Sequence, residues 1–106
     1  MIGTAYDGVM RWLVERRLTD ISSRLKRARE ELAVTEEQLL FWRDEADEAR
    51  IRSLVSETPL ADAQLTEVRK TTNGMANAKA DLEFRIIELL RMQDELLDQL
   101  SSKAKR

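Results

Sequence analysis

The chain has 106 residues, of which 42% are hydrophobic, 36% charged and 5% aromatic, with a net charge of −2. This length limits it to one domain, and the composition favours a long amphipathic helix pair over a compact globule. Because cysteine and histidine are absent, disulfides, thiolate metal sites and histidine-dependent catalysis are excluded.

The first predicted helix covers about residues 5–55, since no glycine or proline follows Gly8 in this stretch. Thr4 and Asp7 resemble a capping box that would start the helix near Ala5, and Asp7 by itself is a competing cap. Apolar or small residues recur along it at alternating spacings of three and four, the pattern of a coiled-coil seam. These seam positions are Val14, Leu18, Ile21, Leu25, Ala28, Leu32, Thr35, Leu39, Trp42, Ala46, Ala49 and Ser53.

A turn is predicted at residues 56–58, with a second helix over about residues 59–101. Thr58 is a suitable N-cap, and Pro59 at the first helical position loses no hydrogen bond. Asp62 adds negative charge where the helix dipole favours it. A basic tail, residues 102–106, is expected to follow the helix.

The second helix carries a matching seam. It consists of Ala61, Leu65, Val68, Thr72, Met75, Lys79, Leu82, Ile86, Leu89, Gln93, Leu96 and Leu100. Asn73-Gly74 would often form a turn. The seam spacing continues through this pair without a phase shift, so a continuous helix is predicted, with Gly74 as a weak point or a place of close backbone approach.

Folding the chain back at Glu57 pairs seam positions whose numbers add up to 114, so that Leu25 faces Leu89. The predicted fold class is all-α: a single antiparallel two-helix coiled-coil hairpin that self-associates into a helical bundle. Polar Lys79 and Gln93 in the seam are expected to fix the register and the number of partners, and the sequence forces no carboxylate into the layer of Lys79.

Charge is distributed in blocks. Residues 11–29 contain seven basic and two acidic residues, a net charge of +5, whereas residues 30–48 contain one basic and eight acidic residues, a net charge of −7. Residues 81–98, with a net charge of −4 from two basic and six acidic residues, would lie beside the basic block. This pattern favours the antiparallel alignment.

Several apolar residues lie off the seam in helical clusters, which usually indicates an interface. They are Trp12, Leu13, Val34, Leu40, Phe41, Phe84, Ile87, Leu90 and Leu97. Three interpretations stay open: self-association into a four-helix bundle, docking of a different protein, or an ordinary apolar surface, with or without helix ends that fold over it.

No constellation of residues predicts catalysis, a metal site or a cofactor. Neighbouring acids such as Glu36 and Glu37 point about 100° apart on a helix and do not converge. No nucleophile has a histidine to activate it. The sequence therefore predicts a protein that is not an enzyme and that holds neither a metal nor a cofactor.

A basic patch could contact the phosphates of a nucleic acid, so nucleic-acid binding is one functional hypothesis. The patch comprises Arg16, Arg17, Arg24, Lys26 and Arg27, with Lys103, Lys105 and Arg106 nearby. Opposing acidic residues and the net charge disfavour this hypothesis. Neither a membrane span nor a signal peptide is recognised, so no membrane contact is expected and a cytoplasmic location is predicted.

The turn offers Arg52, Glu57 and Leu60 as contact residues. A hairpin with an acidic end is similar in general shape to secondary-channel factors of bacterial RNA polymerase. Residues 52–62 (RSLVSETPLAD) and 87–98 (IELLRMQDELLD) resemble segments of small, uncharacterised actinobacterial helical proteins. That resemblance implies a bacterial cytoplasmic setting and assigns no catalytic residue.

These observations predict a non-enzymatic protein–protein interaction or adaptor protein that forms homo-oligomers. Its partners would be itself and another cytoplasmic protein or complex. The alternative is a hairpin factor that binds a large bacterial machine, RNA polymerase or the ribosome, through its turn.

Overall fold

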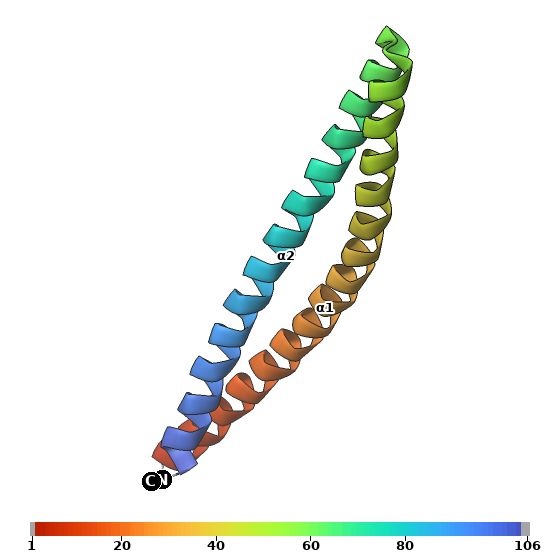
Figure 1. Ribbon diagram of the computed structural model, residues 1–106. Coiled ribbons are helices and arrows are strands. Elements are labelled where there is room, and N and C mark those ends of the chain that lie inside the picture. Colours follow the sequence, from red (N-terminus) through yellow and green to blue (C-terminus); the bar gives the residue numbers. More distant parts are fainter. Residues whose placement is uncertain (1, 105–106) are drawn as a thin grey trace. The chain divides into compact units, whose positions relative to one another are not determined.

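The computed structural model describes the backbone of residues 2–104 and the side chains of residues 6–102. It contains two helices, α1 (Ile2–Ser56) and α2 (Pro59–Ala104), joined by Glu57 and Thr58 (Figure 1). The two helices pack antiparallel, and residues 2–104 contain no strand. The predicted all-α hairpin is therefore confirmed.

Two helix ends differ from their predicted places. Helix α1 begins at Ile2, three residues before the predicted start, so Thr4 lies within the helix and is not its N-cap. A cap contributes only about 1 kcal/mol and can be outweighed when the helix extends by another turn. Helix α2 continues through most of the predicted tail to Ala104, whereas Lys105 and Arg106 lie outside the described residues.

The chain divides into two compact units, which are described separately. The terminal unit consists of Met1–Arg29 and Phe84–Arg106, and the turn unit consists of Glu30–Glu83. The core of the terminal unit is formed by seam residues of both helices. Its buried members are Val14, Ile21, Leu25, Ala28, Leu89 and Leu96, against which Leu18, Ile86, Leu90 and Leu100 pack.

The core of the turn unit contains Leu39, the most deeply buried large side chain among the described residues at 1% exposure. Leu82, Ala49 and Ala61 are also buried here. The Thr72 hydroxyl lies 3.2 Å from the backbone oxygen of Trp42 and 2.8 Å from that of Val68. The bond to Trp42 joins the two helices at the seam layer in which Trp42 and Thr72 were predicted to face each other.

Burial follows the predicted seam throughout. Each of the 24 predicted seam positions is buried or half-buried. The ammonium of Lys79 leaves the seam and lies 4.0 Å from a carboxylate oxygen of Glu36, an exposed residue outside the seam. Glu36 follows Thr35, the residue predicted opposite Lys79, and the long side chains bring the two charges together from adjacent positions.

The turn combines one strained residue with one good cap. Glu57 has a φ of 50°, in the left-handed region, and its N–H donates to the oxygen of Ser53 at 3.1 Å. This is the αL form of helix termination, in which glycine is the usual residue. As predicted, Thr58 caps α2: its hydroxyl accepts a bond from the N–H of Ala61 at 3.2 Å. Ser53 also donates a hydrogen bond to Asp62 and links the two helices.

Gly74 lies within α2, as predicted, and has no positive φ. A Cβ placed on it would meet nothing within 4 Å, so within this chain the glycine does not serve a close backbone approach.

Candidate interaction surfaces

Exposed apolar side chains occur in both units. In the terminal unit, Trp12 and Leu13 of α1 and Phe84, Ile87 and Leu97 of α2 are exposed. The sixth predicted interface residue of this unit, Leu90, is instead half-buried and packs against the core. It is a weaker interface candidate than the sequence suggested, because much of its surface is already removed from water.

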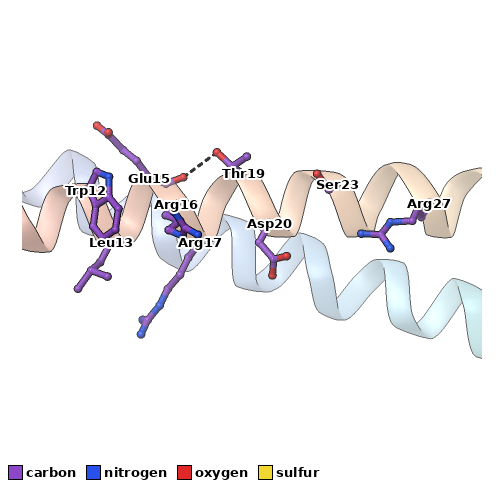
Figure 2. Close-up of a pocket in the computed structure, with 9 residues that line it drawn as sticks. All are labelled: Trp12, Leu13, Glu15, Arg16, Arg17, Thr19, Asp20, Ser23 and Arg27. Atoms are coloured by element: carbon purple, nitrogen blue, oxygen red, sulfur yellow. Dashed lines mark hydrogen bonds between the residues drawn. The ribbon is translucent and has the colours of Figure 1, made fainter.

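An open groove of about 790 Å³ lies on α1 of the terminal unit. Figure 2 shows Trp12 and Leu13 at one end, Arg27 at the other, and Arg16 and Arg17 between them. The guanidinium of Arg16 lies 5.5 Å from the centre of the Trp12 ring, within the range of a cation–π interaction. The groove therefore combines an aromatic end with several positive charges.

The two acidic residues of the groove already have partners. Glu15 pairs with Arg11 at 3.1 Å, and Asp20 pairs with Arg24 at 3.2 Å. Such exposed pairs contribute little to stability. They nevertheless compensate both acids with arginines that do not line the groove, and the charges of Arg16, Arg17 and Arg27 therefore dominate it.

All five residues of the predicted basic patch are exposed on α1 of the terminal unit. The ion pairs described in this unit, which also include Arg91 with Glu88 at 2.9 Å and with Glu95 at 3.0 Å, join residues of the same helix. The pKa of Arg91 is raised, and the largest cause is the hydrogen bond that its guanidinium donates to Glu88. The negative charges of Glu88 and Glu95 raise this pKa further. The basic block is thus presented largely to solvent.

In the turn unit, Val34, Leu40 and Phe41 are exposed on α1. The Phe41 ring is 57% exposed and stands edge-on to Trp42, with centroids 5.4 Å apart and an interplanar angle of 84°. Glu37 and Asp44, both exposed, lie three or four residues from Leu40 and Phe41 and share their helix face. We call this apolar surface with its flanking acids the acidic stripe.

At the turn, Leu60 is exposed, Arg52 lies 3.9 Å from Glu48, and Glu57 has the left-handed backbone described above. Sequence reasoning missed three neighbours: Ile51, Leu54 and Val55 are also exposed, Val55 at 79%. The off-seam criterion that selected Phe41 would have found them, had it been applied through the last turns of α1. We call Ile51, Leu54, Val55 and Leu60 the apolar tip.

Within residues 6–102, no group of three or more acidic residues is arranged to hold a metal ion. No described helix is both long and apolar enough to cross a membrane. Three surfaces stand out chemically: the groove, the acidic stripe and the apolar tip, each of which exposes large apolar side chains that are consistent with partner binding.

No protein-family model, curated protein or solved structure matches the chain. The structure thus supports a two-helix hairpin with exposed apolar surfaces that are consistent with partner binding.

Proposed function

We propose that this protein is a non-enzymatic interaction protein that associates with itself through the off-seam apolar residues of its helices. The single observation that carries the proposal is the solvent exposure of large apolar side chains grouped on helix faces, notably Leu40 and Phe41. A seam of two helices leaves such faces uncovered, and a helical bundle formed with a second copy would bury them.

The setting proposed for this role is a bacterial cytoplasm. The absence of cysteine is compatible with such a reducing compartment. The self-associated protein would leave a second surface free to hold another protein, which is the adaptor role.

Self-association is tested by measuring mass in solution over a wide range of protein concentrations. We expect the wild-type protein to exceed the mass of one chain and Phe41→Glu to shift it toward the single chain, because a charge replaces an apolar contact. Gln64→Glu introduces the same charge at an exposed position that carries no apolar side chain, and it is the control. A wild-type mass of one chain at every concentration would refute self-association.

The apolar tip supports a second candidate function, the binding of a large bacterial machine such as RNA polymerase or the ribosome. Four large apolar side chains lie exposed around one turn, and Glu57 keeps a left-handed backbone that is costly for a non-glycine residue. A contact made by the Glu57 side chain would account for its presence in place of glycine.

This alternative is tested by sedimentation with purified ribosomes and with RNA polymerase. If the tip binds, Glu57→Lys abolishes co-sedimentation while Phe41→Glu retains it. The self-association hypothesis predicts the reverse sensitivity for solution mass. Glu57→Gln removes the charge with little change in size, and it separates the loss of a carboxylate from the addition of a new positive charge.

A further inference from the structure

The chain carries two exposed faces of opposite charge, and each has an aromatic residue. On α1 of the terminal unit, the groove holds Trp12 beside Arg16, with Arg17 and Arg27 further along. On α1 of the turn unit, Phe41 lies between Glu37 and Asp44. Each face therefore offers what the other lacks.

We infer that the acidic stripe of one copy docks into the groove of a second copy, with Glu37 and Asp44 facing the arginines of the groove. This inference rests on the proposed self-association and names the two surfaces that meet. Charge complementarity selects this occupant over an uncharged apolar helix, because positive surface facing negative surface excludes partners of the wrong sign.

The acidic stripes of two copies repel each other. Residues 30–48 carry a net charge of −7, so two stripes face to face would bring like charges together. The basic stretch, residues 11–29 with a net charge of +5, removes this repulsion and supplies Trp12 and Leu13 for apolar contact. Every chain thus contains both halves of the contact.

The geometry of a single helix face supports the pairing. Glu37, Phe41 and Asp44 are spaced four and three residues apart, and Trp12 and Arg16 are spaced by four. Residues at these spacings are neighbours on a helix surface. Two α1 segments lying side by side can therefore meet through continuous rows of side chains, with aromatic residues and charges on both sides.

The experiment uses two charge-reversed full-length proteins. One carries Arg16→Glu with Arg27→Glu, and the other carries Glu37→Lys with Asp44→Lys. We expect each alone to self-associate on the order of 100-fold more weakly than wild type, because two attractive charge pairs become repulsive. Mixed in equal amounts, the two proteins restore association, since every reversed charge now meets its opposite.

A control protein with Lys70→Glu and Asp94→Lys has one charge of each sign reversed, at exposed positions of α2 outside both faces, and should associate as wild type does. Raising the salt concentration should weaken wild-type association, because exposed charges are screened beyond about 10 Å at 0.1 M. Circular dichroism of each variant checks that the helices form.

The outcomes separate the inference from the proposed function. Wild-type association that ignores salt, or a mixture that stays as single chains, overturns the docking inference while self-association stands. Wild-type protein that is a single chain at every concentration overturns both. A reversed protein that associates normally by itself shows that another surface makes the contact.

Discussion

Leu39 and Leu40 are adjacent and identical in chemistry, yet the seam buries the first and exposes the second. Leu39 is 1% exposed and Leu40 is 64% exposed. Replacing Leu39 with alanine removes apolar atoms from a closed contact and leaves a cavity, which in protein cores costs about 2–5 kcal/mol. A two-helix seam is thin and can relax partly, so we expect a loss of about 2.5 kcal/mol.

This loss converts to a clear change in Tm. Unfolding entropy is about 2.1 cal/mol/K per residue, or about 0.2 kcal/mol/K for this chain, so Leu39→Ala lowers Tm by about 11 °C. Leu40→Ala changes stability by less than about 0.5 kcal/mol, because its side chain is already in water. Thermal unfolding followed by circular dichroism measures both variants.

Protein concentration must be varied, because self-association stabilises the folded state by mass action. At the lowest concentration, where single chains dominate, only Leu39→Ala should show a low Tm. If both substitutions lower Tm equally there, the assignment of seam and outer positions is wrong. A loss below about 1 kcal/mol for Leu39→Ala would refute the cavity reasoning.

Three further substitutions test local features by urea unfolding. Glu57→Gly should stabilise the fold by about 1 kcal/mol, since glycine adopts the left-handed backbone without a steric penalty; Glu57→Ala should not, and equal effects would contradict the strain argument. Gly74→Ala should also stabilise by about 1 kcal/mol, because a Cβ meets nothing within 4 Å there; a destabilised variant would show that the site is crowded. Thr58→Ala should cost about 1 kcal/mol, because the bond to the N–H of Ala61 is lost, whereas Thr58→Ser should retain most of the stability.

The seam could be predicted because it depends on a local period. Alternating spacings of three and four place one row of side chains on one side of a helix, and two matching rows bury each other. The same period placed Asn73-Gly74 inside the second helix. The local chemistry of a threonine before Pro59 placed Thr58 at the N-cap of that helix. These features depend on residues close in sequence, whose effects add up along each helix.

Side-chain direction and backbone strain were not predictable in the same way. Leu90 lies beside the seam residue Leu89, and only packing shows that it folds against the core. Lys79 reaches Glu36 because two long side chains bend toward each other from adjacent positions. Nothing in the sequence around Glu57 indicates a left-handed backbone, since glycine or asparagine is usual there.

Some features of the candidate interaction surfaces follow from the sequence, and others follow from packing. The sequence alone determined the two helices, their antiparallel pairing and the charge blocks, because periodicity and composition act through position along the chain. Only the tertiary structure decided how much of each off-seam side chain remains in water: it covered part of Leu90 and formed the groove beside Trp12. Exposure depends on where neighbouring side chains come to rest, and this is settled by packing in three dimensions.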